Sequence, residues 1–228
     1  MGCRWYLAMT ASEMHGYMGS KKIAWMSCHF SAYSTGLSNL PIYLPPDSLV
    51  ILDDRNPLSD HDPQRIAAQL SGIENMAGLL LDLQQPSNGI LDMIHYLHKA
   101  LSCPVAVTET YAKDTECAVF VSAPLNLPLE DTIKPWQGRQ IWLDIPFGMQ
   151  TFTITKSGCD ISPIQPWDDQ PFPHREDSLS CSYRMQKASD HICFTLCRKP
   201  ETITNILSQA DALNIPCAIS LYQEYLRK

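Results

Sequence analysis

Short runs of apolar residues, separated by polar or turn-forming stretches, dominate the pattern of hydrophobic and polar positions along the chain. Apolar runs of about four to eight residues bounded by turn signals are typical of parallel strands buried on both faces. Residues 1–20 show little periodicity, so we expect an N-terminal extension or a loose first element there and a single folded domain over 21–228. The pattern predicts eight parallel strands, over 23–28, 49–53, 78–82, 105–108, 118–122, 140–144, 191–196 and 217–221.

Helical signals lie between several of these strands. Asp62 followed by Pro63 predicts the start of a helix over 63–71, because an N-cap carboxylate accepts first-turn amides and proline suits the first helical position. Asn88 is the expected N-cap of a second helix, over 89–101, which has one apolar stripe at helical spacing. A third helix is expected over 201–213, with a short terminal helix after it.

The alternation of strands and helices breaks in the second half of the chain. Residues 151–161 alternate polar and apolar positions around Lys156-Ser-Gly, which predicts an antiparallel hairpin. The proline-rich segment 163–173 is expected to be a surface loop, and 180–184 a short edge strand.

Eight strands with intervening helices predict an α/β fold, an irregular (β/α)8 TIM-like barrel with stunted helices and a β-hairpin insertion near 151–161. The alternative is an open doubly wound sheet. Its phosphate-binding form carries a glycine-rich turn after the first strand, and Met26-Ser-Cys-His-Phe-Ser contains no glycine. The barrel is therefore the preferred interpretation.

Carboxylates recur where these strands end, at the edge where barrel proteins gather their ligand sites. Cleavage of a glycosidic bond uses two carboxyl groups, one as acid and one as base or nucleophile. We expect Glu109 to be the acid and Asp82 the nucleophile or base, because they end neighbouring strands. The alternative is that each of these strand-end carboxylates only caps the loop or helix that follows it. The predicted substrate-binding residues are Asp53, Asp54, Gln84, Tyr111, Asp144, Tyr222 and Glu224.

Aromatic residues lie near the same strand ends, where a sugar ring could stack on them. Besides Tyr111 and Tyr222, they include Tyr33, Trp136 and Trp142. The alternative is that these rings pack in the core and at its rim.

The segment Ala77-Gly-Leu-Leu-Leu-Asp-Leu-Gln84 resembles the Asp-Gly-x-Asp-x-Asp-x-Glu strand of the chitinase-like (family 18) glycoside hydrolases. Gly78 and Asp82 match, whereas Ala77 and Leu80 replace aspartates and Gln84 replaces the catalytic glutamate. The resemblance implies a barrel with a sugar-shaped groove. Gln84, however, cannot donate a proton as the catalytic glutamate of the family does. The motif falls on the third predicted strand, whereas the family has it on the fourth. The whole chain also resembles an uncharacterised bacterial family of small barrels.

Composition and net charge limit the classes of partner and the compartment that we expect for the protein. A net charge of −7 with scattered basic residues argues against nucleic acid and anionic membranes. No apolar run approaches the roughly 20 residues of a membrane helix, and the first residues do not form a secretory signal. Nine cysteines without a Cys-x-x-Cys motif favour a reduced, cytoplasmic protein.

Metal and cofactor signals are weak. The chain has no His-x-His or His-Glu-x-x-His motif, and we expect His95 and His98 to lie on the solvent face of a helix. We therefore predict no metal and no cofactor. The expected function is hydrolysis of an unidentified carbohydrate by paired carboxylates, and the alternative is a non-catalytic barrel that binds a carbohydrate or a peptide.

Overall fold

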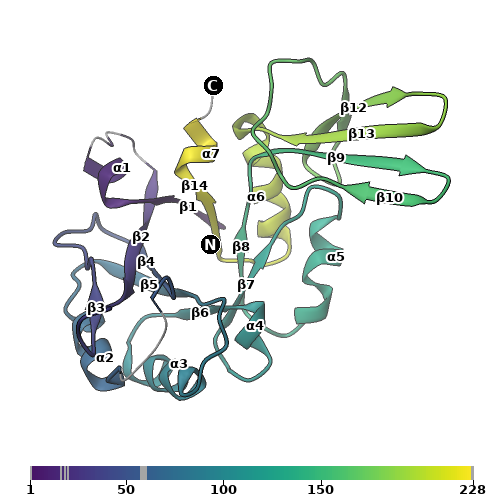
Figure 1. Cartoon of the computed structure of the whole chain (residues 1–228). Helices are drawn as coiled ribbons and strands as arrows, with labels where there is room; N and C mark the ends of the chain where they lie inside the picture. The colour runs from purple at the N-terminus through teal and green to yellow at the C-terminus, as the bar shows by residue number, and fades with distance from the viewer. Residues whose placement is uncertain (1, 16, 18, 20, 57–60, 227–228) are drawn as a thin grey trace. The chain divides into compact units, whose positions relative to one another are not determined.

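A computed structural model describes residues 2–15, 17, 19, 21–56 and 61–226. Its main sheet has the strand order β1-β14-β8-β7-β6-β5-β4-β2-β3, and β1 also pairs with β2 (Figure 1). This second pairing closes eight parallel strands into the expected (β/α)8 barrel. The barrel strands are β1 (Arg4–Met9), β2 (Lys22–Phe30), β4 (Ser48–Asp53), β5 (Met76–Asp82), β6 (Val105–Thr108), β7 (Ala118–Ser122), β8 (Ile141–Asp144) and β14 (Cys217–Leu221).

Two of the strand predictions were wrong. Residues 1–20 are not only an extension, because β1 lies within them and pairs in parallel with β2. Tyr6–Met9 are all buried, and a strand covered on both faces has no polar alternation to reveal it. Conversely, 191–196 is not a barrel strand but part of β13 (His191–Arg198), which is antiparallel to its neighbours.

The helices between the barrel strands are few and short, as expected. Among the described residues, α2 (Pro63–Ser71), α3 (Ile90–Ala100) and α6 (Ile203–Ala212) exceed two turns. The shorter ones are α1 (Ala11–His15), α4 (Glu109–Ala112), α5 (Leu129–Ile133), α7 (Tyr222–Leu226) and the 3-10 turns η1 (Lys134–Trp136) and η2 (Pro200–Thr202). None of the described helices combines the length and the hydrophobicity that crossing a bilayer requires.

The first turns of α2 and α3 differ in how they are capped. The Asp62 carboxylate accepts the amide of Gln64 at 2.9 Å, so the predicted cap of α2 is confirmed. At α3 the predicted cap was wrong. Gly89, in the left-handed region with φ 79°, precedes the first helical residue in place of Asn88, and no side chain caps the first turn. A residue without Cβ adopts this conformation at little cost.

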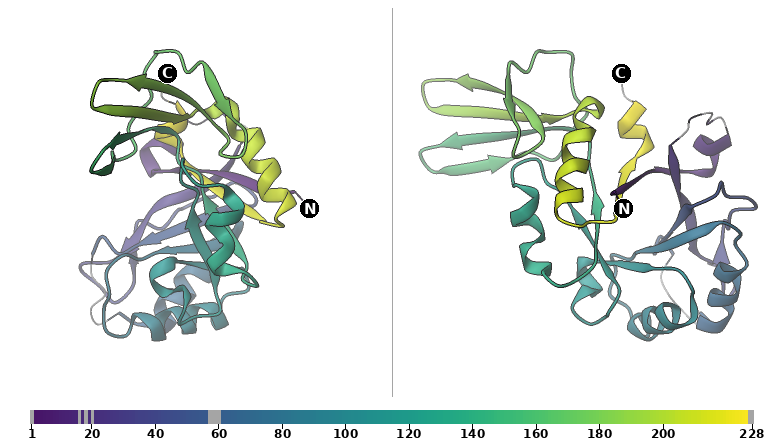
Figure 2. Two further views of the ribbon diagram at one scale, coloured as in Figure 1. Left: turned by 90° about the vertical axis from the view of Figure 1, so that its right-hand side faces the viewer. Right: turned by 180° about the vertical axis from the view of Figure 1, so that it is seen from behind.

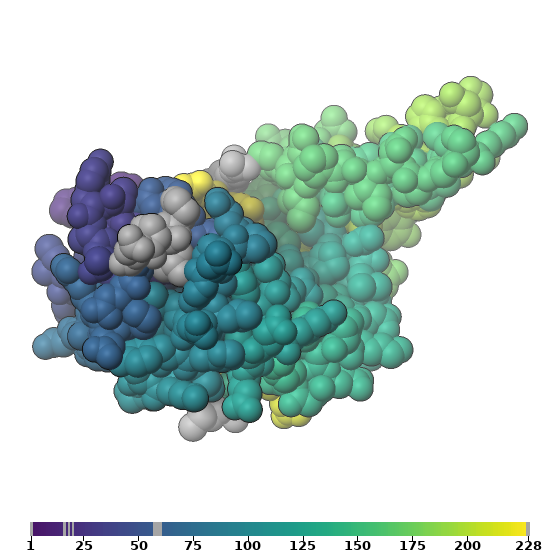
Figure 3. Space-filling view, turned by 60° about the horizontal axis from the view of Figure 1, so that its bottom comes forward, coloured from purple at the N-terminus to yellow at the C-terminus, as the bar shows by residue number. Residues whose placement is uncertain are grey.

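The insertion is larger than the predicted hairpin. It is a five-stranded antiparallel sheet with the order β10-β9-β13-β12-β11. Its strands are β9 (Gly148–Thr155), β10 (Gly158–Ile161), β11 (His174–Glu176), β12 (Cys181–Lys187) and β13. The hairpin of β9 and β10 is confirmed, whereas β12 is an interior strand and not the expected edge. The tips of the two hairpins extend away from the rest of their own unit (Figures 2 and 3).

The chain divides into two compact units, which we describe separately. The N-terminal unit comprises Trp5–Val121 and Gly138–Trp142, and the C-terminal unit comprises Met1–Arg4, Ser122–Gln137 and Leu143–Lys228. The description of 21–228 as one domain stays a prediction. In the N-terminal unit the apolar faces of β4, β5 and β6 are buried, and α2 packs beside α3.

Gly78 on β5 has a structural reason to be glycine. A Cβ at this position would lie 2.7 Å from Cη2 of Trp142 and 3.0 Å from Cδ2 of Leu49. The indole of Trp142 is buried against the strand, as the packing alternative for the aromatic residues describes. This contact explains the glycine of the resembling motif without any role in chemistry.

Candidate functional site

The ends of β4 and β5 bring predicted carboxylates together in the N-terminal unit. Asp53 and Asp82 are partners in the parallel register of these two strands. Because β1 is the first barrel strand and β3 is not part of the barrel, β5 is the fourth barrel strand in chain order. The motif that resembles the chitinase-like enzymes therefore lies on the fourth strand, the position that it has in that family.

Asp54 holds the loop that follows β5. Its side chain is buried, with 8% of the residue exposed. Oδ2 accepts the backbone amides of Gln84 at 2.8 Å and Gln85 at 2.6 Å. A carboxylate that accepts hydrogen bonds from two backbone amides holds that part of the backbone in place. Asp54 therefore positions Gln84 and leaves little of its own surface to a ligand.

Asp82 is half-buried beside this loop. Its Oδ1 accepts the side-chain amide of Gln84 at 2.7 Å. Burial raises the pKa of Asp82 above its ordinary value; the Gln84 hydrogen bond acts against this, and the negative charges of Asp53 and Asp54 add to it. Asp53 is itself paired with Arg55, at 3.3 Å between Oδ2 and Nη2. The group offers several hydrogen-bonding atoms at the ends of β4 and β5.

The end of β6 supports the same loop. The Thr108 hydroxyl donates to the carbonyl of Leu83 at 2.8 Å, and the Tyr111 hydroxyl donates to the carbonyl of Gln85 at 2.8 Å. Tyr111 is only 5% exposed, so it supports the loop as a packed residue. Burial, and then the charge of Asp54, raise its pKa. Glu109 is the first residue of α4 and is exposed.

The remaining predicted residues belong to the C-terminal unit. Asp144, at the end of β8, accepts the hydroxyl of Ser122 at 2.8 Å. Glu224, in α7, accepts the amide of Phe147 at 2.9 Å, and Tyr222 is the first, half-buried residue of that helix. The structure thus describes two groups of predicted residues, one in each unit.

The sequence did not reveal the supporting roles of Gln85 and Thr108. Thr108 donates its hydroxyl to the carbonyl of Leu83, and Gln85, itself in the loop after β5, is bonded through its backbone to Asp54 and Tyr111. Such bonds depend on register between strands, which the composition of one strand does not encode. The turn-forming run Gln84-Gln-Pro-Ser-Asn-Gly was the one available signal that this loop is built in a special way.

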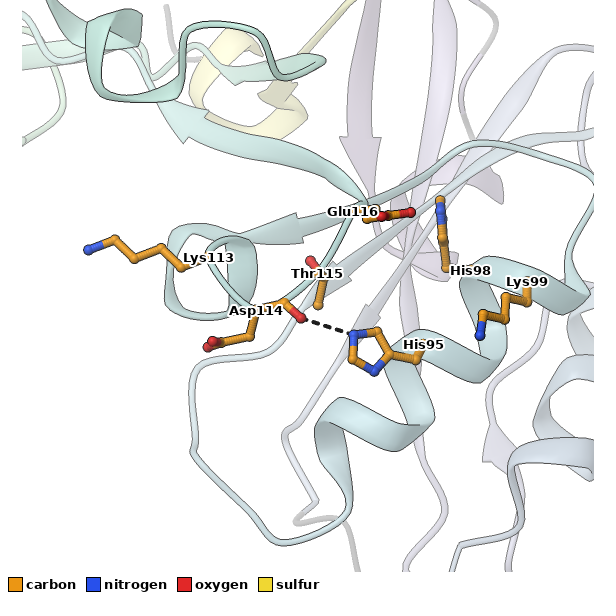
Figure 4. A pocket seen from close by; sticks show the side chains of 7 residues that line it. All are labelled: His95, His98, Lys99, Lys113, Asp114, Thr115 and Glu116. Atoms are coloured by element: carbon orange, nitrogen blue, oxygen red, sulfur yellow. Dashed lines mark hydrogen bonds between the residues drawn. The ribbon is translucent and has the colours of Figure 1, made fainter.

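A separate depression of about 470 Å³ lies at the other end of α3 (Figure 4). His95, from α3, contacts the carbonyl oxygen of Asp114 through Nε2 at 2.9 Å. His98 and Glu116 also line this depression. It lies where α3 ends and β7 begins, at the amino ends of the strands, where barrels place stabilising contacts more than chemistry. The described residues contain no group of three or more His, Cys, Asp or Glu arranged to hold a metal ion.

The fold is similar to that of several solved barrels. The spore cortex-lytic enzyme SleL of Bacillus megaterium superposes with a TM-score of 0.55 at 8% identity, covering 98% of this chain and 71% of that one. The C-terminal domain of a putative chitinase from Desulfitobacterium hafniense gives 0.57 at 8% identity, covering 99% and 95%. A chitinase from Chromobacterium violaceum gives 0.54 at 11% identity, covering 98% and 95%.

At these identities the likeness concerns the fold. No family model matches the sequence, and no curated protein is similar to it at a significant level.

Proposed function

We propose that the protein is a glycoside hydrolase-like barrel that binds a carbohydrate at the carboxyl ends of β4, β5 and β6 without cleaving it. The observation that carries this proposal is the Gln84 side chain, which stands at the position of the catalytic glutamate and donates to Asp82. An amide has no proton to give to a glycosidic oxygen at neutral pH. It can nevertheless hydrogen-bond to a sugar hydroxyl.

The neighbouring residues suit a binding role. Asp82 and Asp53 provide acceptor oxygens for hydroxyl groups, and exposed Glu109 provides another at the end of the adjacent strand. Asp54 and Tyr111 keep the loop in place through its backbone. The fold shared with chitinases and a spore cortex-lytic enzyme supports a carbohydrate as the class of ligand.

Titration calorimetry on the purified protein tests this proposal, with N-acetylglucosamine and glucose oligomers as probes. We expect one of these series to bind, and Gln84→Ala to weaken that binding by about threefold to tenfold, the worth of one hydrogen bond. Gln64→Ala, an exposed glutamine on α2, is the matched control and should leave affinity unchanged. Absence of binding to both series, or equal effects of the two variants, would contradict the proposal.

Hydrolysis is the second candidate function, and the raised pKa of Asp82 favours it. A carboxyl group with a raised pKa suits the general acid, which would give Asp82 that role and Glu109 the role of base or nucleophile. This reverses the roles expected from the sequence. A screen of chromogenic glycosides beside Asp82→Asn and Glu109→Gln separates the candidates: turnover that falls about 10²–10⁴-fold in both variants would establish hydrolysis.

Two further expectations stay proposals. All nine cysteines are free thiols, which supports a reducing compartment such as the cytoplasm. The net charge of −7 supports a neutral or cationic ligand in preference to nucleic acid or an anionic membrane.

A further inference from the structure

The barrel strand β2 contains one residue more than a regular pairing with its neighbour β4 requires. Trp25 pairs with Val50, but Cys28 pairs with Leu52, so two residues of β2 stand opposite one residue of β4. An extra residue of this kind is a β-bulge, which is rare between parallel strands. It reverses the side of the sheet to which the following side chains point. At the rims of barrels, bulges often re-aim a side chain.

The bulge brings His29 into one row with two carboxylates of the site. After the bulge His29 pairs with Asp53, and Asp53 in turn pairs with Asp82 on β5. Register partners on adjacent strands point to the same side of the sheet. Without the extra residue, Cys28 would stand beside Asp53, and His29 would point to the opposite side. The row therefore crosses three adjacent strands, β2, β4 and β5 (Figure 1).

This row faces the interior of the barrel. Gly78 precedes Asp82 by four residues on β5, so both point to the same side of the strand. On that side a Cβ of Gly78 would meet the indole of Trp142. Trp142 belongs to β8, which is not a neighbour of β5 in the sheet. His29, half-buried, thus points inward at the carboxyl ends of the strands, where barrels bind their ligands.

A hydrogen bond within the bulge fixes the ring of His29. Its Nδ1 atom lies 3.0 Å from the carbonyl oxygen of Ser27, which can only accept. Nδ1 therefore carries the proton of the neutral imidazole, and Nε2 has a free lone pair. No hydrogen bond links Nε2 to a residue that the structure describes. The Ser27 hydroxyl accepts the amide of Ala11 at 3.0 Å, which ties the bulge to the segment after β1.

We propose that His29 is a further ligand-binding residue of the site of Asp82 and Gln84, and that its Nε2 accepts a hydrogen bond from a sugar hydroxyl. The inference rests on the proposed function, because the ligand is the same carbohydrate. A hydroxyl group suits the row, since the carboxylates of Asp53 and Asp82 are acceptors as well. Adjacent strands lie about 4.8 Å apart, so two linked sugar units can reach all three side chains.

NMR spectra of protein with 15N-labelled histidine test the geometry without depending on a ligand. At pH 8 we expect His29, assigned through the signal that His29→Phe removes, to carry its proton on Nδ1. The opposite tautomer, with the proton on Nε2, would overturn the inference. Addition of a bound sugar tetramer should then shift the Nε2 resonance of His29. The resonances of His98, at the amino ends of the strands, should not move.

Titration calorimetry with glucose tetramer and N-acetylglucosamine tetramer tests the contact itself. His29→Phe keeps a ring but has no acceptor, so it should weaken binding by about threefold to tenfold, the worth of one hydrogen bond. His29→Gln offers a side-chain oxygen in place of Nε2 and should retain more of the affinity. His98→Phe, at a half-buried histidine of α3, is the matched control and should leave the affinity unchanged. If His29→Phe does not fold, the Nε2 shift in the parent protein decides.

The outcomes separate this inference from the proposed function. Binding that Gln84→Ala weakens and His29→Phe does not would overturn the role of His29 and leave the proposed function intact. Binding that His29→Phe weakens and Gln84→Ala does not would support His29 and contradict the role of Gln84. Absence of binding to both tetramers would contradict the proposed function, and the role of His29 with it.

Discussion

The side-chain amide of Gln84 donates a 2.7 Å hydrogen bond to Oδ1 of Asp82, two residues earlier on the same strand end. In the motif that this segment resembles, a glutamate stands at the position of Gln84. Two carboxyl groups at this distance would share a proton, whereas the NH2 group of the amide donates a hydrogen bond without titrating. The pair is thus suited to a fixed hydrogen-bonding role, and Asp82 is the one residue of the two that gains or loses a proton.

That titration predicts how stability depends on pH. The pKa of Asp82 is raised in the folded protein, chiefly by burial, so the native state holds this proton more tightly than the unfolded chain. The contribution of Asp82 to stability therefore decreases as pH rises from the unfolded-state pKa through the folded-state pKa, and stays at the lower level above it. Asp82→Asn removes this cost and can still accept from Gln84.

We expect Asp82→Asn to be more stable than the parent protein at pH 7, with the difference vanishing as pH falls below the ordinary aspartate range. Urea unfolding at a series of pH values measures it. A parent protein and a variant whose stabilities run parallel over the whole series would contradict the assignment.

Asp54 should be a determinant of both stability and ligand affinity. Asp54→Ala leaves the amides of Gln84 and Gln85 without their acceptor in a buried place. Charge-assisted hydrogen bonds of this kind are worth about 1.5–3 kcal/mol each, so we expect a loss of about 3 kcal/mol in the free energy of unfolding. Carbohydrate affinity should fall as well, because Gln84 loses its position. Asp160→Ala, an exposed aspartate of β10, should change neither quantity.

Gly78 should not tolerate a methyl group. Gly78→Ala would force the indole of Trp142 to move, and overpacking of this kind costs about 1–3 kcal/mol. Gly78→Ala combined with Trp142→Phe should recover part of the loss, because the smaller ring frees the space. Gly72→Ala is the control, since a Cβ there meets only ordinary contacts at 3.5 Å and the backbone is right-handed. Thermal unfolding of the four proteins decides; equal melting temperatures for Gly78→Ala and the parent protein would refute the contact.

Arg198 in the C-terminal unit should stabilise the fold through hydrogen bonds to backbone carbonyl groups. It is 1% exposed, and its guanidinium donates to the carbonyl oxygens of Ala123, Pro124 and Leu179 at 2.7, 3.0 and 3.1 Å. Burial lowers its pKa to about 10. Arg198→Met leaves three carbonyl groups without this donor, and we expect a loss of about 2–4 kcal/mol. The exposed Arg175→Met serves as control in the same denaturant series, and a smaller loss for Arg198→Met than for this control would contradict the role.

The sequence predicted the barrel, and its strand count was right because two errors cancelled. The strand at Tyr6–Met9 was missed because a run buried on both faces shows no alternation of polar and apolar residues. The segment 191–196 has a similarly apolar composition, but it pairs antiparallel with β9 and β12. Composition does not encode which neighbour a strand takes. Asp53, Asp82 and Gln84 were predicted at one strand edge and lie together there. The support that Asp54 and Tyr111 give to the loop depends on register, which no single segment contains.

The position of β1 in the sheet constrains how the chain folds. The strand order places β1 beside β14, so the ring of strands closes between segments at residues 4–9 and 217–221. Contacts over so long a separation form late and slow the folding of a domain. During synthesis β1 can pair with β2 soon after both have been made, whereas its edge toward β14 stays open until residues 217–221 have been made. Until then this edge of an apolar strand has no partner, and edges of this kind make partly folded chains prone to aggregation.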